Sequence, residues 1–148
     1  GDRHGFTATL PATDGTHTVC IYGINTPTGT NPLLACKTVT VDNPTPVGIL
    51  DVAVAGPSSG TISVSGWAMD PDTSAPINVH VYVDHTPTIL TADGYRPDVA
   101  AVYRNGDRHG FTATLPATDG THTVCIYGIN TPTGTNPLLA CKTVTSVM

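Results

Sequence analysis

Glutamate is absent from this 148-residue chain, and lysine occurs only as Lys37 and Lys142. Charged residues make up 11% of the sequence and the net charge is −5, whereas about 25% of a typical globular domain is charged. This balance excludes a basic nucleic-acid-binding surface. The 15 glycines and 13 prolines argue against a helical bundle, because both residues break helices. No apolar run approaches the roughly 18 residues of a membrane-spanning helix, so we expect no membrane span.

The sequence also lacks the short motifs of common enzymes. It contains no Gly-x-Ser-x-Gly, no phosphate-binding loop and no His-Glu-x-x-His. The acidic residues are all aspartates in turn-like settings, and the histidines show neither metal-ligand spacing nor a nucleophile partner. We therefore predict no enzymatic activity and no cofactor. A pocket that gathered His80, Asp98 and His109 would reopen the question.

An internal repeat dominates what is present. Residues 1–40 are identical to residues 106–145, and the offset of 105 residues is a normal size for one small β domain. Either a tandem array or a deliberate duplication explains this identity; the stiff, proline-set stretch 42–46 favours the array. We predict a partial repeat over 1–41, a linker over 42–46 and a complete repeat over 47–148. The chain opens in mid-pattern without a signal peptide, so we interpret it as a piece of a longer protein.

Short alternating segments separated by turns predict an all-β fold. Seven such segments with turns every 8–12 residues are typical of a seven-stranded, antiparallel immunoglobulin-like sandwich. The expected strands cover residues 48–55, 61–69, 77–84, 86–92, 110–115, 121–130 and 138–144. Residues 98–103 are the one stretch that suits a helical turn. The partial repeat would hold only the last three strands of a unit, over residues 5–10, 16–25 and 33–41.

The four cysteines fit the last two strands of each copy. Cys125 and Cys141 lie symmetrically about Thr133, so an antiparallel hairpin centred there places them opposite each other. We predict the disulfides Cys125–Cys141 and, by sequence identity, Cys20–Cys36. Free buried thiols are the alternative. The same register places Tyr127 opposite residue 139, and it assigns residues 124, 126, 138, 140 and 144 to the core face. Paired cysteines in a small β domain indicate an oxidising, extracellular compartment.

Two sets of motifs carry a resemblance to known families. Residues 115–130 (LPATDGTHTVCIYGIN) resemble the region of the fifth to seventh strands in fibronectin type III-like modules, with His122 at the usual position of a corner tyrosine. The ordered set GWAMDPD (66–72), RPDV (96–99), HGF (109–111) and HTVC (122–125) resembles a tandem module of secreted, cell-wall-associated actinobacterial proteins. The resemblance covers nearly all of residues 47–145. It implies a secreted spacer, adhesive or wall-associated module without catalytic residues.

Two pairs of residues are candidates for ligand binding, and each has a structural alternative. Asp70 and Asp72 offer carboxylates to a calcium ion, but Asp-Pro-Asp-Thr is more often an Asx-type turn. Arg96 and Asp98 could read a ligand. The favoured interpretation is structural: Arg96 either covers Trp67 or pairs locally with Asp98, and so fixes a long loop.

The partial repeat poses a packing problem. Without a first half to cover it, this segment exposes apolar side chains, namely Val19, Ile21, Leu33 and Val39. Residues 47–103 could complete a unit with either copy. Pairing with residues 1–41 would make a circularly permuted unit, and linker 42–46 is too short to span the height of the sandwich as that arrangement requires. We expect copy 106–146 to complete the unit. We also expect residues 1–41 to pack against another chain or a neighbouring repeat.

These observations predict a non-enzymatic structural repeat of a secreted or cell-surface protein. It would space, display or assemble that protein through strand exchange or head-to-tail contacts. The alternative is a module that binds a cell-wall polysaccharide by stacking exposed aromatic rings on sugars. The rings available for that role are Trp67, Tyr82, Tyr95 and Tyr103.

Overall fold

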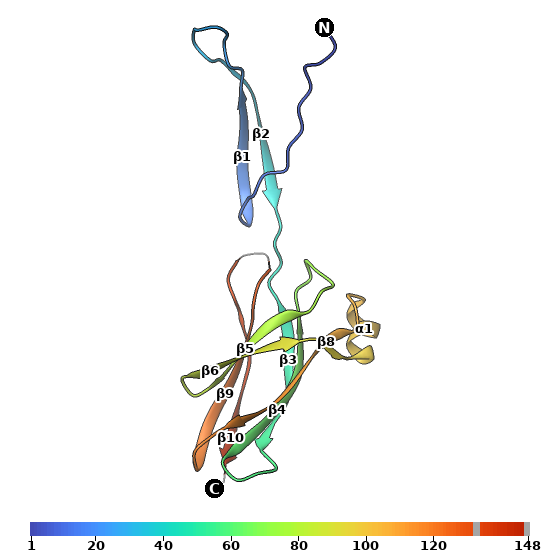
Figure 1. Cartoon of the computed structure of the whole chain (residues 1–148), viewed down its shortest axis with the longest axis vertical. Helices are drawn as coiled ribbons and strands as arrows, with labels where there is room; N and C mark the ends of the chain where they lie inside the picture. The colour runs from blue at the N-terminus through green and yellow to red at the C-terminus, as the bar shows by residue number, and fades with distance from the viewer. Residues whose placement is uncertain (132–133, 147–148) are drawn as a thin grey trace. The chain divides into compact units, whose positions relative to one another are not determined.

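Threonine, valine and isoleucine alternate over short stretches of the chain and favour extended strands. The structure is a computed structural model that describes residues 1–131 and 134–146. The contacts within it divide the chain into unit 1, Gly1–Asn43, and unit 2, Pro44–Met148. The boundary falls within residues 42–46, and every strand pair in both units is antiparallel (Figure 1).

Two four-stranded sheets make up unit 2. One has the order β10-β9-β5-β6, from the strands Leu138–Ser146, Gly120–Gly128, Ile77–Val83 and Thr86–Ala92. The other has the order β3-β4-β8-β7, from the strands Val47–Ala55, Thr61–Met69, Arg108–Pro116 and Gly94–Tyr95. All seven expected segments contain strands in the described part of this unit. The eighth strand, β7, has only two residues and pairs with β8.

The core of unit 2 lies between these sheets. Alternate residues of facing strands point inward, as the period of two requires. The most deeply buried apolar side chains come from both sheets: Ile62 and Val64 from β4, Val79 and Val81 from β5, and Val124 and Ile126 from β9. Phe111 and Leu115 of β8 and Val144 of β10 complete the same cluster. Unit 2 is therefore an antiparallel all-β fold whose main core lies between its two sheets.

A short helix, α1 (Pro97–Tyr103), covers a second apolar cluster. Pro97 occupies the first turn, where its missing N–H costs nothing, and Arg104 ends the helix in the left-handed conformation at φ 53°. Val99 packs with Trp67 and Met69. No helix in the described part of the chain is long and apolar enough to cross a membrane.

The β9–β10 hairpin aligns Cys125 with Cys141, and their sulfur atoms form a disulfide. Thr133, the centre of the predicted symmetry, lies outside the described residues. The prediction that Tyr127 lies opposite residue 139 is wrong, because a bulge after Leu138 pairs Tyr127 with Leu138 instead. Leu138 is consequently exposed rather than part of the core. Leu139 packs against the core instead.

Unit 1 contains a single hairpin, β1 (Gly15–Tyr22) with β2 (Leu33–Val41), closed by the disulfide Cys20–Cys36. The predicted strand over residues 5–10 is not formed (Figure 1). Its identical counterpart in β8 pairs with β4 along its length. Unit 1 holds no counterpart of β4, so its backbone groups have no strand to pair with.

Candidate functional site

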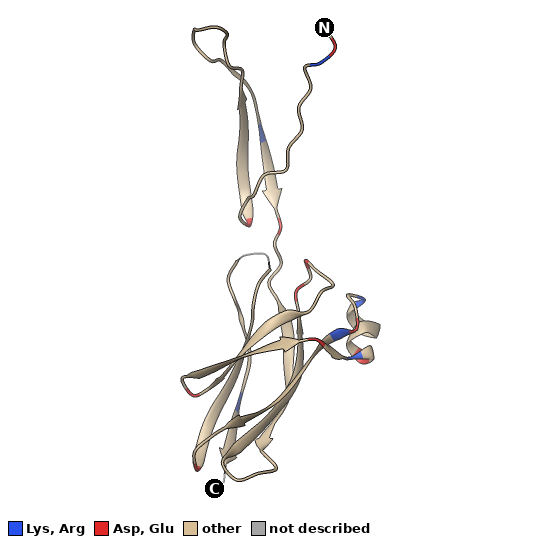
Figure 2. Cartoon of the chain, in the orientation of Figure 1, with Lys and Arg blue, Asp and Glu red and all other residues tan. Residues whose placement is uncertain are grey.

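The two rings nearest α1 serve the fold of unit 2. Trp67 is only 4% exposed, and the ring of Tyr103 lies 4.9 Å from it, centre to centre. Trp67 therefore cannot stack on a ligand, and Tyr103 covers it instead. Six of the twelve charged residues of unit 2 fall within residues 93–108, which include α1, and charge is sparse over the long strands (Figure 2).

Arg96 connects α1 to strand β3. Its Nε and Nη2 donate to the two carboxylate oxygens of Asp98 at 2.9 and 2.8 Å, and its Nη1 donates to Asp51 at 2.9 Å. The hydrogen bond from Arg96 lowers the pKa of Asp98 to about 2, and the same bond raises the pKa of Arg96. All three guanidinium nitrogens thus donate within the protein, and the nearby carboxylates of Asp98 and Asp51 disfavour an anionic ligand there. Arg96 and Asp98 form the local pair that the sequence favoured, with Asp51 as a third member.

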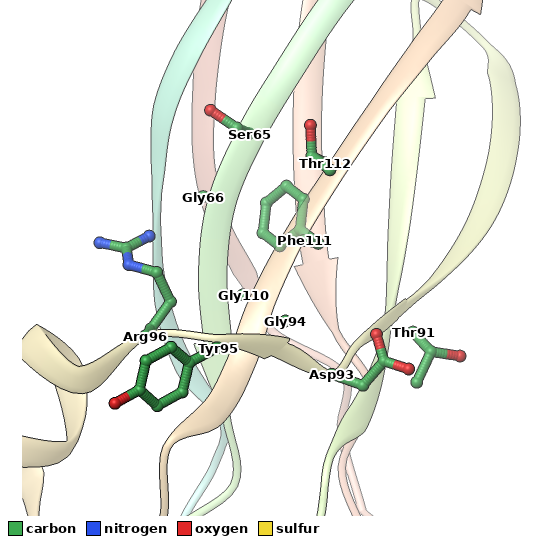
Figure 3. Close-up of a pocket in the computed structure, with 10 residues that line it drawn as sticks. All are labelled: Ser65, Gly66, Thr91, Asp93, Gly94, Tyr95, Arg96, Gly110, Phe111 and Thr112. Carbon is green, nitrogen blue, oxygen red and sulfur yellow. The ribbon is translucent and has the colours of Figure 1, made fainter.

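A shallow pocket of about 320 Å³ lies beside this group, and Tyr95 stands at its rim (Figure 3). Phe111 forms part of its wall, and Asp93 and Thr91 project at the other end. Gly66 also lines the pocket. A side chain at this position would meet the carbonyl of Ile49 and the ring of Phe111, so only glycine fits there. The ring of Tyr95 is 61% exposed, and the guanidinium of Arg108 lies 5.8 Å from its centre.

A second aromatic pair lies on the outer face of the other sheet. Tyr82 of β5 and Tyr127 of β9 meet edge to face, with their ring centres 5.5 Å apart. They line a hollow of about 500 Å³ with His80 and His85. Tyr82 is one of the predicted stacking residues, whereas Tyr127 was not predicted to be one. Period-two alternation places Tyr127 on the outer face, but only the β5–β9 register places it beside Tyr82.

The four predicted stacking residues therefore do not form one site. Trp67 and Tyr103 lie against α1, Tyr95 lies beside β8, and Tyr82 lies on the opposite sheet.

Asp70 organises a turn. It is fully buried, and its carboxylate accepts the N–H of Asp72 at 2.9 Å and both the N–H and the hydroxyl of Thr131, at 2.8 and 3.0 Å. The bond to the N–H two residues on is the Asx turn that the sequence favoured over a calcium site. No cluster of three or more potential metal ligands occurs among residues 1–131 and 134–146.

The three residues that could have suggested catalysis are separated. His80 lies on β5, His109 lies on β8 in the other sheet, and Asp98 is bound to Arg96. The Nε2 of His109 donates to the carbonyl of Asn105 at 2.6 Å, so this buried ring holds the loop before β8.

His122 and Asp84 fasten the two halves of unit 2 together. The Nδ1 of His122 lies 2.7 Å from the carboxylate of Asp84, and its Nε2 lies 2.8 Å from the carbonyl of Thr118. Both partners accept hydrogen bonds, so the arrangement favours the doubly protonated imidazolium, in which both ring nitrogens donate. The Asp84 carboxylate also accepts the N–H of Thr123 at 2.9 Å. The hydrogen bond that His122 donates to Asp84 raises the pKa of His122, and the bonds that Asp84 accepts from Thr123 and His122 lower the pKa of Asp84.

This pair makes the stability of unit 2 depend on pH. A raised pKa means that His122 stabilises the fold at pH values below its ordinary pKa of 6.5, and that this stabilisation is lost as pH rises through the folded value. The lowered pKa of Asp84 means that its carboxylate stabilises the fold above its ordinary pKa of 3.8. That stabilisation is lost as pH falls through the folded value. We expect the urea midpoint of unit 2 to be higher at pH 5.5 than at pH 8.5. His122→Gln should remove part of that difference; an unchanged difference would contradict the assignment.

The strongest candidate for a functional surface is in unit 1. The same 40 residues occur in both units, but only in unit 2 does a first half cover them. We call residues 44–105 the first half-unit, and residues 106–146 and 1–41 the two second half-units. Identical side chains differ sharply in exposure: Phe6 78% against Phe111 5%, Leu10 71% against Leu115 4%, Val19 44% against Val124 0%, and Val39 45% against Val144 4%.

Val19 and Val39 are exposed and Ile21 is half-buried, and these three side chains form what we call the bare face on the hairpin of unit 1. Their counterparts in unit 2 all belong to its core. Leu33 does not belong to this face, because its counterpart Leu138 is equally exposed, at 53% for each. Contiguous exposed apolar side chains mark interaction surfaces.

An open strand edge accompanies the bare face. In unit 2, the edge of β9 that faces away from β10 pairs with β5, from Val83 opposite Val124 to Val79 opposite Gly128. In unit 1, β1 pairs only with β2, within a two-stranded sheet. The corresponding backbone groups of residues 19–23 can therefore accept another strand.

No protein-family model matches the chain, and no curated protein matches it.

Proposed function

We propose that the protein is a non-enzymatic structural repeat module of a secreted or cell-surface protein. Its role is to space, display or assemble that protein, and the hairpin of unit 1 is the contact that does so. The observation that carries this proposal is the difference between two identical second half-units, one covered and one bare. The disulfides Cys20–Cys36 and Cys125–Cys141 support an oxidising, extracellular location.

The arrangement of strands supports an immunoglobulin-like or fibronectin type III-like unit. If the two-residue β7 is set aside, the first, second and fifth strands of unit 2 share one sheet, and the third, fourth, sixth and seventh share the other. A constant-type immunoglobulin domain differs by placing its fourth strand in the first of these sheets. His122 also supports the resemblance, since it bonds a carbonyl four residues upstream, as a corner tyrosine bonds the backbone. We extend this to the repeat of secreted actinobacterial wall proteins that the sequence resembles.

Self-association of the whole chain tests the proposal. We expect light scattering to give a mass that rises with concentration, with or without strand exchange. Val19→Asp combined with Val39→Asp should return the chain to a monomer, because two charges then lie on the bare face. Thr18→Asp combined with Thr40→Asp is the matched control, since it adds the same charge to exposed positions on the other face. A monomeric parent chain, or equal loss in both variants, would contradict an assembly role for this face.

A second candidate function is binding of a cell-wall polysaccharide, and the Tyr82–Tyr127 pair favours it. An edge-to-face pair beside an open hollow offers one ring for stacking on a sugar. We expect Tyr82→Ala to weaken retention on purified peptidoglycan about tenfold, equivalent to about 1.4 kcal/mol. Tyr95→Ala, on the other sheet, serves as the control and should retain binding. Equal retention of Tyr82→Ala and the parent chain would exclude this site.

A further inference from the structure

The bare face and the open edge of unit 1 specify a partner. We infer that the hairpin Gly15–Val41 binds a first half-unit, a segment with the sequence of residues 44–105 that has no second half of its own. This inference rests on the proposed function and identifies the partner of the same surface. In unit 2, the identical hairpin pairs with strand β5 of that sequence, and its core residues share one cluster with side chains of residues 44–105 and of β8.

The register of binding follows from unit 2. There, Val83 lies opposite Val124, Tyr82 opposite Cys125 and Val81 opposite Ile126. Because residues 1–40 repeat residues 106–145, the bound segment should place its Val83 opposite Val19 and its Val81 opposite Ile21. Main-chain hydrogen bonds along this edge would supply affinity, and the valines would cover the bare face.

One polar contact is already half-built in unit 1. The Nε2 of His17 lies 2.7 Å from the carbonyl of Thr13, matching the 2.8 Å contact between His122 and Thr118. What His17 lacks is the carboxylate that Asp84 supplies to His122. A first half-unit carries that aspartate at the end of its β5 strand, directly beside the paired edge. Ring orientation and hairpin closure are therefore set before the partner arrives, which lowers the entropic cost of binding.

A second copy of the chain does not satisfy this surface. Each chain has one first half-unit and two second half-units. Any exchange of halves among identical chains therefore leaves one bare hairpin per chain. Two bare hairpins could cover each other's valines, but neither offers an aspartate to His17, since Asp84 has no counterpart in residues 1–41. The surface is completed only by an additional first half-unit.

The experiment adds a separately produced segment of residues 44–105 to the full chain. Identical peptides from the two second half-units have the same mass, so the exposed substitution Thr18→Ser is introduced to distinguish them in hydrogen-exchange mass spectrometry. We expect a one-to-one complex in which the amides of residues 19–23 become protected at least tenfold. A segment carrying Val81→Asp should not bind. A segment carrying Asp84→Asn should bind more weakly, because it offers His17 no carboxylate.

If the free segment aggregates, a chain with the segment covalently joined to unit 1 tests the same binding. Placing residues 44–105 directly before Gly1 reproduces the junction between Asn105 and Gly106 that already occurs in the chain. We expect protection of residues 19–23 to equal that of residues 124–128 in this extended chain. Unchanged exchange in the extended chain would overturn the inference, as would a stable dimer of the parent chain that excess segment does not dissociate. Self-association without segment binding would leave the proposed function standing and reject the partner. Segment binding without self-association would support the partner and reject only the assembly of identical chains with one another.

Discussion

Replacing Val124 by aspartate should unfold unit 2, whereas the same replacement at Val19 should leave its stability unchanged. Val124 is fully buried beside Val83, so Val124→Asp places an unpaired carboxylate in an apolar core. We expect a loss of more than about 4 kcal/mol in the free energy of unfolding. Val19 lies on the bare face, and Val19→Asp should change that free energy by less than about 0.5 kcal/mol.

The single tryptophan makes this comparison direct. Trp67 is the only tryptophan of the chain and lies inside unit 2, so its fluorescence in urea reports that unit alone. Equal effects of the two substitutions would mean that both second half-units compete for residues 44–105. Such a result would restore the permuted frame that the short linker argues against.

Removing each disulfide should have a different consequence in each unit. Both bonds join cysteines 16 positions apart, and closing a loop of about 15 residues stabilises a fold by about 3 kcal/mol. In unit 2, we expect Cys125→Ala with Cys141→Ala to lower the free energy of unfolding by about that amount, without disrupting the β5–β9 pairing. In unit 1, β1–β2 forms an isolated two-stranded sheet, which is marginally stable without a cross-link. Cys20→Ala with Cys36→Ala should therefore unfold it.

Hydrogen exchange on the Thr18→Ser chain measures both outcomes. Amides of residues 16–22 should exchange at the rate of an unstructured peptide in the unit 1 variant, while Trp67 reports an unchanged unit 2. Persistent protection of residues 16–22 without their disulfide would show that a partner, rather than the cross-link, holds the hairpin. That partner would have to be present in the same sample, which light scattering can check.

Much of the fold could be predicted because it depends on local patterns. Alternation fixed the positions of the strands in unit 2, since each buries one face. The two disulfides followed from the symmetric spacing of Cys125 and Cys141 about a turn. The pairing of Arg96 with Asp98 was also local. Each of these features involves residues that are close in sequence or related by a single hairpin.

What could not be predicted depends on contacts across the fold. Asp84 and His122 are 38 positions apart and meet only because β5 lies beside β9. The third partner of Arg96, Asp51, lies on a strand 45 positions away. The burial of Trp67 required the position of α1, and the bulge at Leu138 shifted a register by one residue. Residues 5–10 failed to form a strand because a strand needs a neighbour, and its sequence does not supply one.

The disulfide of each hairpin also bears on how such a chain responds to force. Residues between Cys125 and Cys141 are held within a loop whose ends lie 4.1 Å apart at their Cα atoms. Fully extended, a stretch of 16 peptide steps would span about 55 Å. If tension unravels a unit, that length stays locked, and only the chain outside the loop lengthens. An oxidised array of these units would therefore release less contour length per unfolded unit than a reduced array. Its total length would increase less when it is pulled.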